Sequence, residues 1–244
     1  MKRREPVPLP VHAEGAARAG TRSEKILTER PFHMTFKIDL HVHSKYSGDN
    51  DADPEETVVR AIERGLNGIV FTEHYLYQAS EPVEALKEKY RDRILVMRGV
   101  EFSAEEGHCL VFGADTDMLS MKYAPLREVV RRVNRAGGVV VPSHPYRSVN
   151  SVGDLLGSVK GIAALEGYNG CNMHAFNAKA IDAAQRLLLP YTGGSDSHAP
   201  NEVGSCYTEF GSMPTAENFI ELLKAGNYRG IDTRKISRMM INTF

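Results

Sequence analysis

The sequence lacks any apolar run close to the roughly 20 residues that a membrane-spanning helix needs. No apolar stretch follows the basic residues 2–4, which argues against a secretory signal, and four glutamates in the first 30 residues argue against a transit peptide. The 3 cysteines, Cys109, Cys171 and Cys206, are far apart and show no Cys-x-x-Cys spacing. Such a set carries no disulfide framework, suits a reducing compartment and is typical of small core residues. We therefore expect a cytoplasmic protein.

Excess charge is also lacking, because 30 basic and 31 acidic residues give a formal net charge of −1. A chain this close to neutral exerts no global attraction on nucleic acids or membranes. With 42% hydrophobic and 25% charged residues it has the composition of an ordinary globular protein. Its 244 residues are enough for one large domain or two small ones.

Residues 1–33 differ from the rest of the chain. They contain four prolines, no sustained apolar periodicity, and seven basic residues against four acidic ones. This composition predicts a disordered tail, with a short helix around Ser23–Glu29 as an alternative. Met34 directly precedes the first strand-like run, so a natural start at Met34 is a second interpretation of the tail. We expect one domain over residues 34–244.

From Phe36 onward strand-like and helical stretches alternate, which favours an α/β fold with a parallel sheet and helical crossovers. Prolines in the first helical turn and glycines at helix ends support the helix boundaries. The predicted strands are Phe36–Val42, Gly68–Thr72, Ile94–Val100, Cys109–Phe112, Gly138–Val141, Ile162–Leu165 and Tyr191–Gly193. The predicted helices are Pro54–Arg64, Pro82–Tyr90, Pro125–Ala136, His174–Leu188 and Thr215–Ala225.

Histidines and carboxylates stand where the predicted strands end. Six of the 9 histidines lie beside a strand end or in the loop after it, and Glu101 closes the run Ile94–Val100. Alternate residues of a strand face the same way, so His41 and His43 can hold one metal ion. In parallel α/β folds active sites are assembled at the carboxyl ends of the strands. Such a mixture of imidazole and carboxylate ligands suits zinc, manganese or iron.

These motifs resemble the PHP (polymerase and histidinol phosphatase) family. The resemblance covers roughly Lys37 to Phe210 and is carried by Asp39-Leu-His-Val-His-Ser, Thr72-Glu-His, Gly99-Val-Glu, Pro142-Ser-His-Pro-Tyr-Arg and Gly194-Ser-Asp-Ser-His, in this order. The segment from Ala164 to Asn177 also resembles the C-terminal part of stand-alone members. The resemblance implies a distorted (β/α)7 barrel of the PHP type and a centre of two or three divalent metal ions.

The resemblance also implies which residues hold the metals. His41, His43, Glu101 and Asp196 would hold one ion, and Glu101 would bridge to a second that His108 and His144 complete. Asp49, His74 and His198 would hold the third. The acid after His43 could equally be Asp51 or Asp53, and the role of His108 depends on loop geometry because it precedes a strand. Relatives often have Asp where Glu73 stands, so the resemblance does not determine which residues contact the metal ligands from outside.

Arg147 and Lys45 are the predicted substrate-binding residues. The planar guanidinium of Arg147, three residues after His144, can grip a phosphate, and a surface ion pair is the alternative. Lys45 has a weaker claim of the same kind. We expect Asp39 to orient a histidine from outside the ligand set, with strand-end capping as the alternative.

The sequence thus predicts a metal-dependent phosphoesterase with Glu101, Arg147 and Asp196 at its catalytic centre. Clustered divalent metals make hydroxide available near neutral pH, and attack on phosphorus is assisted by charges that neutralise the phosphoryl oxygens. The expected substrate is a small phosphorylated metabolite, a nucleotide or a short oligonucleotide. No membrane and no obligatory protein partner are expected. An amide or lactone hydrolase and a non-catalytic PHP module are the alternatives.

Overall fold

The computed structural model describes residues 35–117 and 123–234, so the predicted tail and its boundary at residue 34 lie outside the described residues. Within these two ranges no helix is long and apolar enough to cross a membrane. The described chain has a mixed α/β fold. Its strands are β1 (Phe36–Val42), β2 (Gly68–Phe71), β3 (Leu95–Arg98), β4 (Val100–Ala104), β5 (Gly107–Phe112), β6 (Val139–Pro142), β7 (Leu165–Asn169), β8 (Tyr191–Gly194), β9 (Cys206–Phe210) and β10 (Tyr228–Asp232).

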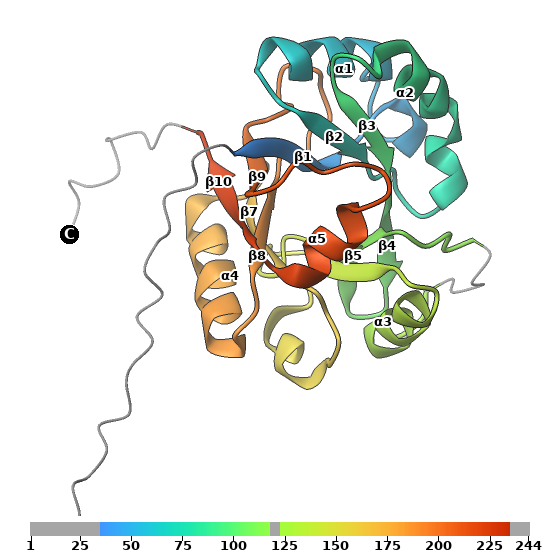
Figure 1. Ribbon diagram of the computed structural model, residues 1–244. Helices are drawn as coiled ribbons and strands as arrows, with labels where there is room; N and C mark the ends of the chain where they lie inside the picture. The colour runs from blue at the N-terminus through green and yellow to red at the C-terminus, as the bar shows by residue number, and fades with distance from the viewer. Residues whose placement is uncertain (1–34, 118–122, 235–244) are drawn as a thin grey trace, which may run out of the picture. The chain divides into compact units, whose positions relative to one another are not determined.

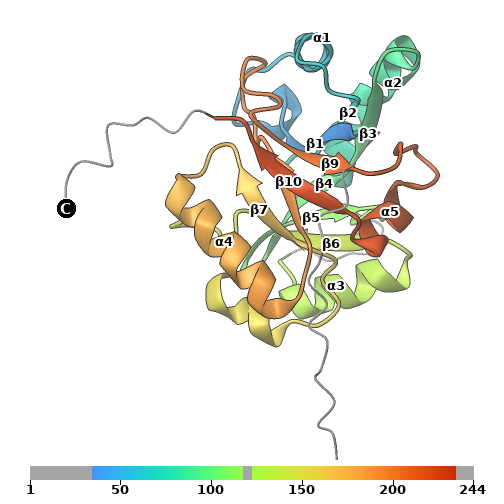
Figure 2. The ribbon, with the colours of Figure 1, turned by 60° about the vertical axis from the view of Figure 1, so that its left-hand side comes forward.

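The helices lie on the outside of the strands in both views (Figure 1, Figure 2). They are α1 (Pro54–Glu63), α2 (Glu84–Tyr90), α3 (Leu126–Arg135), α4 (His174–Leu187) and α5 (Phe219–Ala225), with short 3₁₀ helices at Lys45–Ser47, Tyr77–Val83 and Gly153–Ser158. Asp53 caps α1 by accepting from the backbone N–H groups of Glu55 and Glu56, and Pro54 fills the first turn. In α3 the buried residues Leu126, Val129, Val130 and Val133 recur at helical spacing and pack toward β6.

The strands form three sheets, with orders β10-β9-β1-β2-β3, β4-β5-β6 and β7-β8. The predicted parallel pairing holds for β1-β2-β3 and β7-β8, whereas β4-β5-β6 and the β1-β9-β10 side are antiparallel. The prediction of a parallel sheet is therefore confirmed for β1-β2-β3 and β7-β8 and wrong for the antiparallel pairs. The physical reason at β4-β5 is the connection, because the two residues Glu105 and Glu106 between these strands allow only a hairpin.

Other differences concern strand boundaries. The strand predicted over Ile94–Val100 is two strands, β3 and β4, with Gly99 packed against the carbonyl of Val111 between them. β7 begins at Leu165, where the predicted strand ended, and β9 and β10 were not predicted. Of the cysteines, Cys109 and Cys206 are buried as expected of core residues, but Cys171 is exposed.

Two isolated parallel bridges tie strand ends together beyond the sheets. Val42, at the end of β1, pairs with Ser197 after β8, and His74, after β2, pairs with Glu101 in β4. These bridges bring segments from distant parts of the sequence to one place. Several of the predicted ligands lie in or directly beside them.

Candidate metal centre

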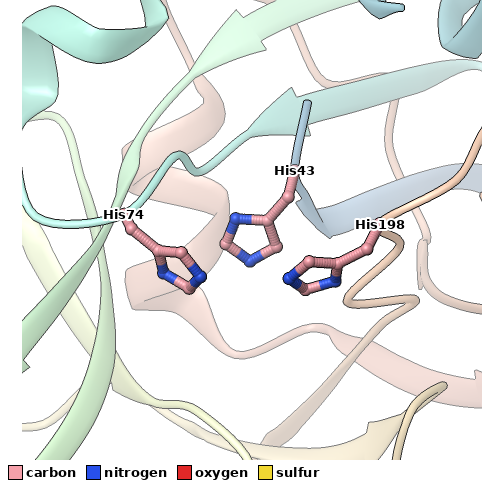
Figure 3. A group of neighbouring side chains, drawn as sticks. All are labelled: His43, His74 and His198. Carbon is pink, nitrogen blue, oxygen red and sulfur yellow. The ribbon is translucent and has the colours of Figure 1, made fainter. Parts of the chain in front are cut away.

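The predicted ligands converge in three groups of side chains whose ligand atoms lie within 4.8 Å of one another. The groups are His41, His43 and Asp196; Glu101, His108 and His144; and His43, His74 and His198. Figure 3 shows the third group, with His43 from the end of β1, His74 from the segment after β2 and His198 from the segment after β8. His43 belongs to two groups, so the groups adjoin one another.

The first group lies close to Glu101, and most of the distances among these side chains approach those of a tetrahedral metal site. The Nε2 atoms of His41 and His43 lie 3.0 Å apart, and each lies 3.3–3.4 Å from Oδ1 of Asp196. Nε2 of His41 lies 3.4 Å from Oε1 of Glu101, and Nε2 of His43 lies 3.6 Å from its Oε2. Ligands at zinc distances of about 2.0–2.2 Å on a tetrahedron are separated by about 3.3–3.6 Å. The distances to the carboxylate oxygens match this spacing, whereas the two Nε2 atoms lie closer together. His41, His43 and Asp196 thus converge as ligands of one metal ion could, with Glu101 beside them.

Glu101 is the hub of the cluster, buried with 1% of its side chain exposed. Its Oε1 lies 2.8 Å from Nε2 of His144 and 3.4 Å from Nδ1 of His108, and its Oε2 lies 3.1 Å from Nδ1 of His74. His108 reaches it because β4 and β5 pair in a hairpin that places Ser103 opposite His108 and Glu101 opposite Leu110. Residues two apart on a strand share a face, so Glu101 and His108 are diagonal neighbours. This geometry suits a bridging carboxylate.

Asp49 is the acid that reaches the third group. Its Oδ2 lies 3.0 Å from Nε2 of His74 and 3.3 Å from Nε2 of His198. Asp53 instead caps α1 and accepts from Nζ of Lys45 at 3.0 Å. Asp51 is exposed in the loop between them. Of the three acids that the sequence left open, the structure brings Asp49 to the histidines.

Hydrogen bonds fix the proton position on several ligand rings. Nδ1 of His41 lies 2.8 Å from Oε1 of Glu166, and Nδ1 of His198 lies 2.9 Å from the backbone carbonyl of Asp196. Because an ionised carboxylate or a carbonyl only accepts, both Nδ1 atoms carry hydrogen. The Nε2 atoms of the two rings then face the other ligand atoms. This orientation is the one that metal-binding histidines commonly have.

The buried charges favour a cation at this point of the fold. Burial lowers the pKa of the His41 ring, but nearby Asp196, Glu166 and Glu101 raise it well above 6.5. The neighbouring His43 has its pKa lowered to about 4, mainly by burial. For Glu101 and Asp196, burial raises the pKa of each carboxyl, but the surrounding histidines, His41 first, bring it well below its usual value. Both carboxylates are thus ionised and ready to bind a cation.

Two ligand candidates have strained backbones. His144 has φ 30° and Asp196 has φ 54°, in the left-handed region that non-glycine residues rarely adopt. Such residues cost about 1–3 kcal/mol each and cluster at functional sites. The strain here coincides with the densest group of ionisable side chains.

Arg147 lies beside the candidate metal ligands and is hydrogen-bonded to one of them, Asp196. Its Nη2 donates to Oδ2 of Asp196 and, at 3.1 Å, to Asn169, and its Nε donates to Asn172 at 2.9 Å. It also lines a cavity of about 390 Å³ together with Asp49, His74, Glu101, His108, Asp196 and His198. Lys45 is not among the described residues lining that cavity, so its position lends no support to substrate binding.

Among the hydrogen bonds of the described residues, none joins the Asp39 carboxylate to an imidazole ring. Its carboxylate accepts from the backbone N–H groups of His41, Ser195 and Gly204 at 2.7–3.2 Å. It therefore joins β1 to the segments after β8 rather than orienting an imidazole. Burial raises the pKa of the Asp39 carboxyl to about 6.

Sequence reasoning missed Glu166 and Ser47, both of which bond to ligand histidines. Glu166 stands directly after the apolar run predicted as Ile162–Leu165. The rule that identified Glu101 at the end of its run would have identified Glu166 too. Ser47 lies in a 3₁₀ helix after His43, and no pattern in the sequence marks it.

Comparison with known proteins gives the same family as the motifs. Residues 39–187 match the PHP domain, and residues 174–228 match the PHP-associated region. A histidinol-phosphatase of Lactococcus lactis is 27% identical over 117 residues, which cover 43% of this chain and 42% of the relative. An uncharacterised protein of Methanocaldococcus jannaschii is 23% identical over 131 residues, covering 49% of this chain and 74% of the relative.

The fold is also found in solved structures. A two-domain protein from Bacteroides vulgatus, described as containing a predicted PHP-like metal-dependent phosphoesterase, aligns with a TM-score of 0.63 at 21% identity. The alignment covers 83% of this chain and 66% of that protein. At this identity the likeness concerns the fold alone. The matched stretches span less than half of the histidinol-phosphatase and about two thirds of the two-domain protein.

Proposed function

The chain belongs to the PHP domain family, and from this premise we propose that it is a metal-dependent phosphoesterase. The observation that carries the proposal is the convergence of His41, His43 and Asp196 beside Glu101, with two further groups of ligand atoms adjoining them. We take the ions to be two or three divalent metals, zinc, manganese or iron. We also propose that the three sheets belong to the distorted seven-stranded barrel that the family resemblance implies.

Divalent metals in such a centre supply a hydroxide nucleophile near neutral pH and neutralise developing charge. The chain's own residues hold and orient the reactants. Glu101 and Asp196 provide the buried negative charge that retains the metals. Arg147 uses Nε and Nη2 to hold Asn172, Asn169 and Asp196, which leaves Nη1 as the donor for a phosphoryl oxygen.

The size of the site supports a small substrate. The cavity at the ligands measures about 390 Å³, within the range of small-molecule sites. A second cavity of about 410 Å³ shares Tyr75, His108 and Asn150 with it and offers room for the rest of the ester. We propose a small phosphorylated metabolite, a nucleotide or a short oligonucleotide as substrate, with no membrane and no obligatory protein partner.

The test combines elemental analysis with a substrate panel on the purified full chain. Metal-dependent turnover of 4-nitrophenyl phosphate or bis(4-nitrophenyl) phosphate, absent with 4-nitrophenyl acetate and a 4-nitroanilide, is the expected result. Turnover of the acetate or anilide alone would instead identify a carbonyl hydrolase. Bound metal without turnover of any phosphate ester, nucleotide or oligonucleotide in the panel would indicate a non-catalytic module.

A pair of variants tests the centre itself. Glu101→Gln removes a charge beside five ligand histidines, so we expect metal loss and a fall in activity of several orders of magnitude. Glu128→Gln is the matched control, because Glu128 lies on α3 and bonds Arg131 and Arg132 instead. Full activity of Glu101→Gln would contradict the proposal.

A further inference from the structure

Two buried carboxylates lie next to the ligand histidines without belonging to the predicted ligand set. Glu73 is fully buried after β2, and Glu166 is 1% exposed in β7. Carboxylates are seldom buried without partners that satisfy their oxygens. Both carboxylates reach ligand histidines, Glu166 directly and Glu73 through the hydroxyl of Ser47.

Glu73 acts through Ser47. The oxygens of Glu73 accept from the backbone N–H of Ser44 at 3.0 Å, the hydroxyl of Ser44 at 2.6 Å and the hydroxyl of Ser47 at 2.5 Å. A hydroxyl has one proton, and Ser47 donates it to Glu73. Ser47 can therefore only accept hydrogen bonds from its other neighbours. These neighbours are Nδ1 of His43 at 2.9 Å and the backbone N–H of His74 at 3.2 Å. Ser47 thus requires a hydrogen on Nδ1 of His43.

Glu166 acts directly. Its Oε1 accepts from Nδ1 of His41 at 2.8 Å, and its Oε2 accepts from the backbone N–H of His144 at 2.7 Å and from Nδ2 of Asn169 at 2.9 Å. One oxygen therefore fixes the ring of His41, and the other fixes the strained backbone of His144. A glutamine has a single acceptor oxygen and cannot satisfy both sides.

We propose that Glu166 and the Ser47–Glu73 pair are positioning residues that divide the metal centre into two halves. Glu166 positions His41 and His144, whereas Ser47 and Glu73 position His43 and His74. Glu166 holds a hydrogen on Nδ1 of His41 and accepts from the backbone N–H of His144. Ser47, which donates to Glu73, does the same for Nδ1 of His43 and the backbone N–H of His74. In both rings Nε2 is then left to face the other ligands. This inference rests on the proposed metal centre but not on any particular substrate.

The proton position on His43 can be read without metal or turnover. In metal-free protein with ¹⁵N-labelled histidine, long-range ¹H–¹⁵N spectra near neutral pH should show His43 as the tautomer with hydrogen on Nδ1. Ser47→Ala should lose this preference, and Ser47→Thr, which keeps the hydroxyl, should restore it. Ser158→Ala is the control, because that hydroxyl donates to the carbonyl of Leu155 on an exposed 3₁₀ helix. An unchanged His43 tautomer in Ser47→Ala would overturn the proposal.

Metal content then tests the division into halves. Loss of such outer partners weakens metal binding by about 10- to 100-fold. In competition with a chelator, Ser47→Ala should release first the metals of the two groups that contain His43, and retain that of Glu101, His108 and His144. Glu166→Gln should release first the metals that His41 and His144 hold. Double variants that combine each substitution with His108→Ala should therefore differ in metal content. The His108 substitution should further reduce metal retained by Ser47→Ala but change Glu166→Gln little.

Equal losses in both variants, with no difference on the His108→Ala background, would contradict the division. This failure differs from failure of the proposed function. If the wild-type protein binds metal and shows the expected His43 tautomer but hydrolyses no phosphate ester, that result would contradict the proposed function and leave the positioning roles unaffected.

Discussion

Arg147 and Lys45 carry the same charge but occupy different surroundings. Arg147 lines the cavity at the ligands, whereas Lys45 pairs with Asp53 at 3.0 Å. We expect Arg147→Ala to lower kcat/KM for a phosphate ester roughly ten- to a hundredfold, since one charge-assisted contact contributes about 1.5–3 kcal/mol. Its metals should remain, because Asn169 still donates to Asp196. Lys45→Ala is the control and should leave kinetics unchanged.

Kinetics and metal content measured together decide the role of Arg147. Metal loss in Arg147→Ala would mean that its bond to Asp196 is its main role. Unchanged turnover would remove it from the substrate site altogether.

Asp49 and Asp53 offer a second contrast between neighbouring residues of one type. Asp49 contacts His74 and His198, so Asp49→Asn should lower metal content and activity. Asp53→Asn should retain both, because asparagine also caps helices well, and Asp53→Ala should cost about 1 kcal/mol of stability. Elemental analysis and denaturant unfolding at pH 7 check these outcomes. Metal loss in Asp53→Asn but not in Asp49→Asn would assign the ligand to Asp53.

The pH of that unfolding measurement follows from the ionisation of Asp53. The hydrogen bond from Lys45, followed by those from the backbone of α1, lowers the pKa of the Asp53 carboxyl below 3.8. A depressed pKa of an acid contributes stability that is present above about pH 4 and is lost as the pH falls through the folded value. At pH 7 the contribution is therefore complete.

At this scale the nine ligand candidates came from the family resemblance, supported by histidines and carboxylates that stand where several strands end. The motifs could not assign hydrogen-bond partners. Asp39 looks like a partner for a ring on the same strand, yet its oxygens reach backbone amides of segments far along the chain. Ser47 contacts two ligands only because a short 3₁₀ helix turns it back toward β1. Both relations depend on loop conformation.

Among the elements, β8 approaches β1 at a position where only glycine fits. A Cβ on Gly194 would lie 2.4 Å from Cβ of His41 and 2.9 Å from Oε1 of Glu166. Gly194→Ala should therefore destabilise the fold by about 1–3 kcal/mol, and metal content should fall because the ring of His41 is displaced. Gly157→Ala is the matched control, since nothing lies within 4 Å of its Cβ, and should change stability by less than about 0.5 kcal/mol.

Denaturant unfolding and elemental analysis of the two glycine variants check this prediction. Equal stability and metal content in both would mean that β8 can move away from β1 without cost. The close approach would then have no part in building the site.

Hydrophobic periodicity predicted the helices better than the strand pairing. The buried stripe of α3 and the proline start of α1 are local signals, and both helices lie within one residue of their predicted bounds. Pairing depends on contacts between distant segments. β9 pairs with β1 although Phe36 and Phe210 are far apart in sequence. The length of the connection, only Glu105 and Glu106, makes β4 and β5 a hairpin, and the pattern within the two strands does not reveal it.

For the whole molecule, the metal centre links several distant parts of the chain. Its candidate ligands come from β1, β4 and β5, from the chain between β1 and α1, and from the segments after β2, β6 and β8. Bound metals would therefore cross-link the sheets. The raised pKa of His41, caused by Asp196, Glu166 and Glu101 against the effect of burial, lets the metal-free cluster keep some charge balance. We therefore expect metal-free protein to stay folded but to be less stable.

The expected loss follows from mass action. A ligand that binds only the native state stabilises it by about 2.7 kcal/mol at a hundredfold excess over its Kd. For a chain of this size that corresponds to a fall in Tm of about 5–10 °C on chelation, because 1 kcal/mol shifts Tm by about 2–4 °C. Thermal scans before chelation, after it, and after metal is added back measure the change. Glu101→Gln should respond much less, since it holds less metal from the start. An unchanged Tm in wild-type protein whose metals have demonstrably been removed would mean that the centre contributes no cross-link, and that His41 and its neighbours are held by their hydrogen bonds alone.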